Sequence, residues 1–202
     1  AIEKITSAAK WKTSLFTDTK ATETRLKSYS GNSSKVLHIS THGFYFSPPD
    51  KDSLLDVRRV QGNSFSKAVE PMMRSGLLLS GANNIWTGRT PADISNDGVL
   101  TAYEIANLDF SNTELVVLSA CDTGLGDIDY SEGIYGLQRA FRLAGVRSMI
   151  ISLWKVPDEE TTALMTAFYI AWTSGLPMKQ AFEKAQMDLR KRYPEEPYKW
   201  GG

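Results

Sequence analysis

Two short apolar runs, each ending at a chemically reactive side chain, constrain this chain more than any other feature. The first is Val-Leu-His-Ile-Ser-Thr-His-Gly at 36–43, and the second is Leu-Val-Val-Leu-Ser-Ala-Cys-Asp-Thr-Gly at 115–124. Apolar runs of this length predict buried strands of a parallel sheet. The carboxyl ends of such strands meet at one edge, where reactive groups gather. We therefore expect His42 and Cys121 to lie close together, although they are 79 positions apart.

The chemistry of these two residues is that of nucleophilic catalysis. Cys121 is the only cysteine and His42 is one of two histidines. An imidazole beside a thiol accepts its proton and leaves the thiolate that attacks a carbonyl. The N–H groups of Gly43 and Cys121 are candidates to bind the resulting oxyanion. The alternative for Cys121 is that it is a small residue of the core. The other histidine, His38, lies within the first expected strand, and we expect it to be a packed residue without a catalytic role.

The rest of the chain predicts an α/β fold. A mostly parallel sheet covered by helices follows from the alternation of strands and helices in the second half. The segment 44–75 is polar and has little periodicity, so we expect it to be irregular. A helix is expected around 21–27, with Thr19 or Thr22 as its N-cap. The expected strands are 36–40, 77–79, 115–120 and 149–154, and the other expected helices are 100–108, 131–145, one from Pro157 and one from Pro177.

Composition excludes several classes of function. The 202 residues are 42% hydrophobic and 23% charged, with 23 basic and 23 acidic side chains, so no nucleic-acid partner is implied. No apolar stretch is long enough for a membrane span, and the first residues lack a signal-peptide core. A single cysteine fits a reducing compartment. We expect a cytoplasmic protein without a membrane partner.

A chain of motifs resembles one known family, the CHAT domain. They are Ser40-Thr41-His42-Gly43, the segments 74–84 and 97–105, Leu118 to Gly126, Glu132-Gly133 with 136–141, and 152–158. CHAT domains are caspase-like peptidases, in the clan of caspases, separases and gingipains. The resemblance covers nearly the whole chain and implies a caspase-like sandwich, with helices on both faces of the sheet, as a single domain over 1–202.

The resemblance also implies a function. In the family, the histidine before glycine and the cysteine of the Ala-Cys-Asp-Thr-Gly motif form the catalytic dyad, which here is His42 and Cys121. Such domains often follow tetratricopeptide repeats in bacterial proteins and are linked to bacterial defence. The resemblance also implies that the peptidase is inactive until an attached sensor or repeat region changes conformation. The expected substrate is a protein or peptide. A final apolar strand usually follows the Tyr-x-Trp-Gly segment at 198–201, so this chain is expected to be a fragment of a longer protein.

Four residues are candidates for contact with substrate. Ser119 stands where caspases have glutamine and metacaspases have aspartate, and it therefore does not indicate a strict preference for aspartate. Asp122 either caps the loop after its strand or contacts substrate. Asp158 either stabilises a helix N-terminus or lines the pocket. Trp154, at the end of an expected strand, belongs either to the core or to the cleft.

No cofactor or metal site is expected. His38 and His42, four apart on one expected strand, would share a face, but a third ligand is missing. Gly124-Leu125-Gly126 lacks the pattern of a dinucleotide-binding loop. Two alternatives to a peptidase remain: a catalytically silent interaction module with the same fold, and an α/β ligand-binding domain, which the missing phosphate loop disfavours.

Overall fold

The computed structural model describes residues 1–46, 68, 70–86, 96–119, 130–154 and 156–201. The chain divides into two compact units: the larger comprises Thr17–Leu153, and the smaller combines Ala1–Phe16 with Trp154–Gly202. Each unit is described by itself below.

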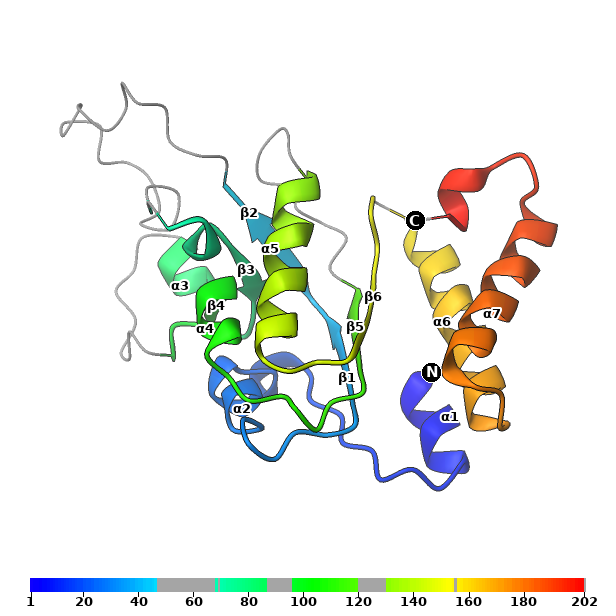
Figure 1. Ribbon diagram of the computed structural model, residues 1–202, viewed down its shortest axis with the longest axis horizontal. Coiled ribbons are helices and arrows are strands. Elements are labelled where there is room, and N and C mark those ends of the chain that lie inside the picture. Colours follow the sequence, from blue (N-terminus) through cyan, green and yellow to red (C-terminus); the bar gives the residue numbers. More distant parts are fainter. Residues whose placement is uncertain (47–67, 69, 87–95, 120–129, 155, 202) are drawn as a thin grey trace. The chain divides into compact units, whose positions relative to one another are not determined.

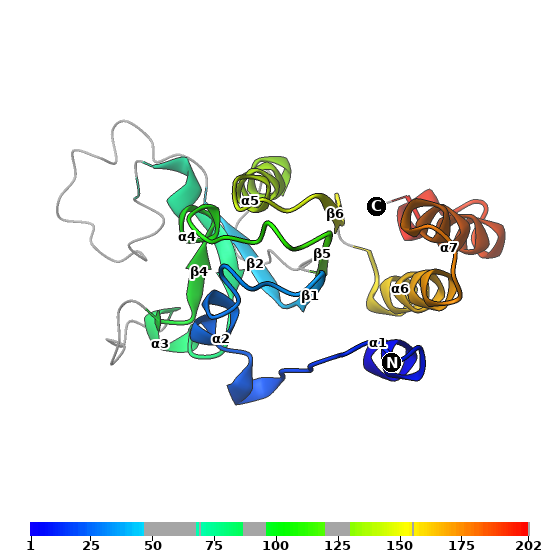
Figure 2. The same cartoon turned by 60° about the horizontal axis from the view of Figure 1, so that its bottom comes forward.

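A parallel sheet is the first element of the larger unit. Its strands β1 (Val36–Ser40), β5 (Leu115–Ser119) and β6 (Ser148–Ile151) lie in the order β1-β5-β6 and are visible in Figure 1 and Figure 2. Leu115 to Leu118 are all buried, which confirms the prediction of a strand covered on both faces. β6 is shorter than the expected strand 149–154, and its residues are only half-buried because it comes last in the strand order.

An antiparallel sheet forms the second element, and the sequence did not predict it. Its strands are β2 (His42–Tyr45), β3 (Ser75–Leu78) and β4 (Val99–Thr101), in the order β2-β3-β4. The strand expected at 77–79 is therefore confirmed, whereas the expected irregular stretch begins with a strand. The helix expected at 100–108 is also partly wrong, because β4 precedes a shorter helix α4 (Ala102–Ala106). Val99 to Thr101 are buried in the sheet, and burial overrides the helical spacing.

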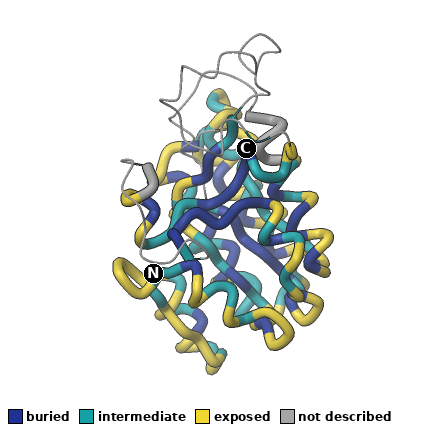
Figure 3. The backbone as a smooth tube through the Cα atoms, turned by 90° about the vertical axis from the view of Figure 1, so that its left-hand side faces the viewer, coloured by how far each residue is buried: buried dark blue, intermediate teal, exposed yellow. Residues whose placement is uncertain are grey.

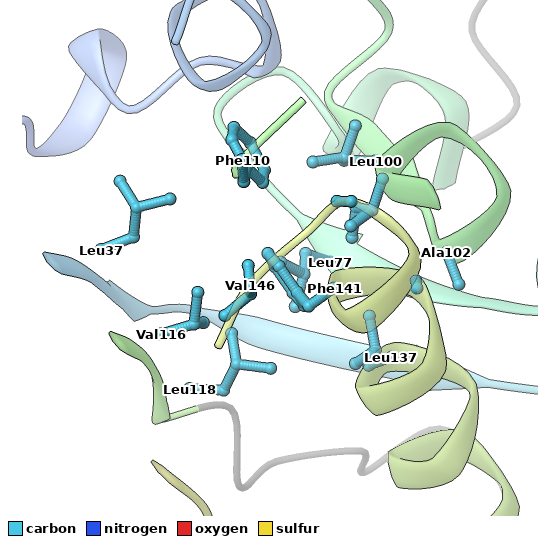
Figure 4. Close-up of a cluster of buried hydrophobic side chains, with 13 residues drawn as sticks. Leu37, Leu77, Leu100, Ala102, Phe110, Val116, Leu118, Leu137, Phe141 and Val146 are labelled. Atoms are coloured by element: carbon cyan, nitrogen blue, oxygen red, sulfur yellow. The ribbon is translucent and has the colours of Figure 1, made fainter. Parts of the chain in front are cut away.

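The core of the larger unit lies among the two sheets and the helices α4 and α5 (Tyr130–Leu143) (Figure 4). α5 matches the predicted helix over 131–145 and packs against α4, β2 and β3. Leu37, Val116 and Leu118 contribute one face of the parallel sheet, since Leu37 pairs with Val116 and alternate residues share a face. Phe110 stacks on Phe141 with ring centroids 6.2 Å apart.

A buried polar network links α2 (Glu23–Lys27) to α4. Thr22 caps α2, as predicted for one of two candidates, by accepting a hydrogen bond from the Arg25 N–H. Glu23 is 2% exposed; its carboxylate accepts the Gly98 N–H at 2.9 Å and pairs with Lys27 at 2.5 Å. The Lys27 ammonium also donates to Glu104 at 2.9 Å, and Glu104 forms a capping box with Thr101.

The charged groups of this network shift one another's pKa values. Burial raises the pKa of the Glu23 carboxyl above its ordinary value, against the lowering effect of Lys27 and the Gly98 N–H. Burial lowers the pKa of Lys27, but its hydrogen bonds to Glu23 and Glu104 outweigh this and leave that pKa raised. For Glu104, burial raises the pKa, and the bonds from Lys27 and Thr101 outweigh it and leave the pKa lowered. The Lys27 ammonium and the Gly98 N–H therefore both favour the ionised form of Glu23, whereas burial opposes it.

Lys27→Met should lower the free energy of unfolding by about 2 kcal/mol at neutral pH, because it leaves the Glu23 carboxylate buried without its counter-charge. Chemical denaturation measures the change. Lys184→Met is the matched control, since Lys184 makes an exposed pair with Asp188 at the same spacing, and it should cost less than about 0.5 kcal/mol. The deficit of Lys27→Met should shrink as pH falls and Glu23 becomes protonated; equal losses in the two variants would contradict this account.

The smaller unit is helical. It contains α1 (Ile2–Ala8), which the sequence did not predict, and the two predicted helices α6 (Asp158–Thr173) and α7 (Met178–Arg192). Trp11 meets Trp172 edge to face at 4.9 Å, and Phe168 stacks on Trp172 at 5.3 Å. The buried residues of α6 and α7 recur at helical spacing, as expected of amphipathic helices, and include Leu164 and Phe168 in α6 and Ala181, Ala185 and Leu189 in α7. Figure 3 shows the backbone of the chain coloured by burial. Short elements complete the described chain: α3 (Asn83–Trp86) and 3-10 turns at Asp18–Lys20, Pro71–Met73 and Pro197–Lys199.

Candidate active site

The carboxyl ends of β1 and β5 lie side by side. The parallel register runs from Val36↔Leu115 to Ser40↔Ser119, an offset of 79 positions throughout. Ser40 is exposed and Ser119 is half-buried. This is the edge at which parallel strands place reactive groups.

His42 lies directly beyond this edge. The chain bends at Thr41 and enters β2, where His42 pairs with Leu78 and Gly43 with Leu77. The His42 side chain is exposed, whereas Gly43 is buried. His38 lies in β1 and His42 in β2, so the expectation that the two histidines share one strand face is wrong. The bend at Thr41 is the physical reason, since it ends one sheet and begins another.

Cys121 and Asp122 lie outside the described residues. Ser119 is the last described residue before them, two positions before Cys121. His42 is likewise two positions beyond Ser40, the register partner of Ser119. His42 and Cys121 therefore have the same offset of 79 positions as the paired residues of β1 and β5.

Asp158 and Trp154 belong to the smaller unit. Asp158 is the exposed first residue of α6, and Glu159 and Glu160 share its first turn, where the helix dipole favours carboxylates. Trp154 is 38% exposed, and its indole N–H donates to the Tyr198 carbonyl at 2.8 Å. It lies outside β6, so the expectation that it ends a strand is wrong.

The acidic first turn of α6 has one structural role that sequence reasoning missed. Glu160 is 6% exposed and pairs with Lys199 at 3.3 Å, and Lys199 also pairs with Glu196 at 3.1 Å. This contact, together with the Trp154 bond, fastens the segment 196–201 to the start of α6. Because Asp158, Glu159 and Glu160 are consecutive, the sequence does not indicate which of the three carboxylates is buried.

The second histidine differs from His42 in its environment. His38 is half-buried in β1, and burial lowers its pKa from 6.5 to about 4. It is therefore neutral at physiological pH, which fits the prediction of a packed histidine.

His38 should make the protein acid-sensitive. Below its unfolded pKa of 6.5 the unfolded chain takes up a proton that the folded chain refuses down to about pH 4. The free energy of unfolding should therefore fall by up to about 3 kcal/mol as pH drops through this window. As pH falls across this window, wild type should lose unfolding free energy relative to His38→Leu by this amount, as measured by denaturation curves of both proteins; parallel pH dependences would show that His38 does not contribute.

The described residues contain no group of three or more histidine, aspartate or glutamate side chains arranged to hold a metal ion. Within the same residues, no helix is both long and apolar enough to span a bilayer.

Comparison with known proteins identifies the family. The CHAT domain matches residues 1–202. The chain belongs to the CHAT domain family. This confirms the resemblance carried by the motifs, and the family is one of caspase-like peptidases.

Two mammalian proteins named for tetratricopeptide repeats are similar to about half of this chain. Tetratricopeptide repeat protein 28 of Mus musculus is 30% identical over 105 residues, which cover 52% of this chain and 4% of that protein. The Homo sapiens protein of the same name is 29% identical over the same length, with the same coverage. This chain thus matches a small part of much longer relatives. No solved structure matches it.

Proposed function

We propose that this chain is a cysteine endopeptidase whose dyad is Cys121 and His42. One observation carries the proposal. The exposed His42 lies two residues beyond Ser40, and Ser40 pairs with Ser119, which is two residues before Cys121. Each residue of the proposed dyad follows by two positions a residue of this last β1–β5 pair, which supports the assignment of both to the same edge of the sheet. Membership in a caspase-like peptidase family supports the assignment.

The reaction follows from the two groups. The His42 imidazole accepts the thiol proton, and the thiolate of Cys121 attacks the scissile carbonyl. The oxyanion is held by the N–H groups of Gly43 and Cys121. Collapse of the intermediate breaks the C–N bond, the imidazolium gives its proton to the leaving amine, and a thioester remains. Water then attacks the thioester with His42 as base, which releases the acid and restores the thiol.

The same proposal includes the pocket and the finer fold. Ser119, Asp122, Asp158 and Trp154 are the proposed contacts of a protein or peptide substrate. Acidic residues outnumber basic ones from Cys121 to Glu160, and a carboxylate-rich rim favours Lys or Arg in the substrate. The proposed architecture is the caspase-like sandwich, with helices on both faces of its sheet.

Regulation is proposed from the relatives. The two mammalian proteins are named for tetratricopeptide repeats, and we propose that this chain is also joined to a repeat or sensor region that controls it. A cytoplasmic location and a role in defence through cleavage of a partner protein belong to the same proposal.

A peptide library tests the activity. The chain and its Cys121→Ala variant are incubated with the library, and the products are identified by mass spectrometry. Cleavage that disappears in Cys121→Ala supports the peptidase, and the residue preferred before the cut tests the acidic rim. The opposite outcome is a protein that cleaves no peptide and does not react with a peptidyl chloromethyl ketone, although iodoacetamide still alkylates Cys121. That result would support the catalytically silent interaction module.

A further inference from the structure

The joint between β1 and β2 is a single residue, Thr41. It is half-buried, and its hydroxyl donates a hydrogen bond to the carbonyl of Leu78 in β3. Leu78 is also the residue that pairs with His42. One side-chain bond thus ties the bend before His42 to the strand beside it.

The ring of His42 lacks a comparable support. Among the residues described by the structure, none makes a hydrogen bond or an ion pair with the His42 side chain. In a serine or cysteine triad, a third residue holds the imidazole in place. Here the position of the imidazole depends on the backbone of His42, at the first residue of β2, where a strand is most easily frayed.

The acceptor of the Thr41 bond is itself held in place. The Leu79 N–H donates to the Gly98 carbonyl at 2.7 Å, and the Ser80 N–H donates to the Ala21 carbonyl at 2.9 Å. The chain directly beyond β3 is therefore held by the residue before β4 and by the segment before α2. Thr41 is thus bonded to a residue whose two successors in the chain are both held by backbone hydrogen bonds.

We propose that Thr41 is a positioning residue that holds His42 in the orientation needed to accept the Cys121 proton. It acts through the Leu78 carbonyl and does not touch substrate. The inference rests on the proposed function, because it assigns to Thr41 the task that a third triad member performs elsewhere. Its motif position, directly before His42-Gly43, is the only sign of it in the sequence.

Two substitutions at Thr41 separate the hydroxyl from the shape of the side chain. Thr41→Val keeps the shape and loses the donor, and Thr41→Ser keeps the donor. We expect Thr41→Val to lower kcat for Cys121-dependent peptide cleavage about tenfold or more, with KM within about twofold, and Thr41→Ser to retain most of the activity. Thr173→Val is the matched control, since it removes a hydroxyl-to-carbonyl bond of 2.7 Å to Tyr169 in α6.

A second readout does not require peptide turnover. The rate at which chloroacetamide alkylates Cys121, followed against pH, reports the thiolate stabilised by imidazolium. Thr41→Val should lose alkylation at mildly acidic pH while Thr41→Ser and Thr173→Val keep it. Urea midpoints of all variants show whether a loss follows from unfolding.

The outcomes are distinct. Thr41→Val with wild-type kcat and a wild-type alkylation profile would overturn the inference, as would equal losses in Thr41→Val and Thr41→Ser. A wild-type chain that shows neither turnover nor alkylation dependent on His42 would overturn the proposed function, and the role of Thr41 with it. Turnover in the wild type together with a selective loss in Thr41→Val supports both.

Discussion

Replacing His42 with glutamine should lower kcat/KM for peptide cleavage by about 10³-fold or more. Glutamine keeps a polar side chain of similar size but accepts no proton from the thiol at neutral pH. His42 is exposed and makes no described side-chain bond, so the loss should occur without a comparable loss of stability. Steady-state kinetics and the urea midpoint, measured together, test both parts of this expectation.

The only other histidine is the matched control. His38→Gln removes the imidazole of β1, which is neutral because burial lowers its pKa to about 4. It should leave kcat/KM within a few-fold of wild type. If the two variants lose activity equally, or if His42→Gln retains it, the dyad assignment is wrong.

Gly76→Ala should destabilise the larger unit by about 3–5 kcal/mol. Gly76 lies in the central strand β3 between Phe44 of β2 and Thr101 of β4. A Cβ there would come within 2.4 Å of the Leu100 carbonyl oxygen, 2.8 Å of the Thr101 Cα and 2.7 Å of the Phe44 ring. Two of these three neighbours are backbone atoms of a paired strand, so they cannot rotate away.

A second glycine separates crowding from backbone conformation. Gly31 has a φ of +79°, and a Cβ there would meet nothing within 4 Å. Gly31→Ala should therefore cost only the left-handed conformation, about 1–2 kcal/mol. Thermal unfolding of both variants checks the contrast; a Gly76→Ala chain as stable as Gly31→Ala would mean that β2 and β4 move apart more easily than their pairing indicates.

The candidate site was predictable as residue types, but one of its contacts, and one contact in the core, were not. Cysteine and histidine at the ends of apolar runs mark their chemistry in the sequence, and the family match supports the motif. The bond from Thr41 to Leu78 spans 37 positions, and that from Gly98 to Glu23 spans 75. Neither has a local pattern, because each depends on which strands become neighbours.

The misplaced elements have the same cause. Residues 99–101 continue into the helical spacing of α4, yet they pair with β3 and are buried there. His42 follows β1 so closely that the pattern reads as one strand, and the bend at Thr41 divides it between two sheets. Local propensity is weak compared with the free energy of burying a strand against its neighbours.

Sequence patterns alone were enough to predict an α/β protein of the CHAT family, with strands at 36–40 and 115–119 and helices after 130, 157 and 177. These features follow from hydrophobic periodicity and from contiguous motifs, which are local. Three features are visible only in the folded chain: Ser40 pairs with Ser119, His42 begins a second sheet, and Glu23 is buried beside Lys27. Register and burial depend on contacts between residues far apart in the chain, and a local pattern cannot specify them.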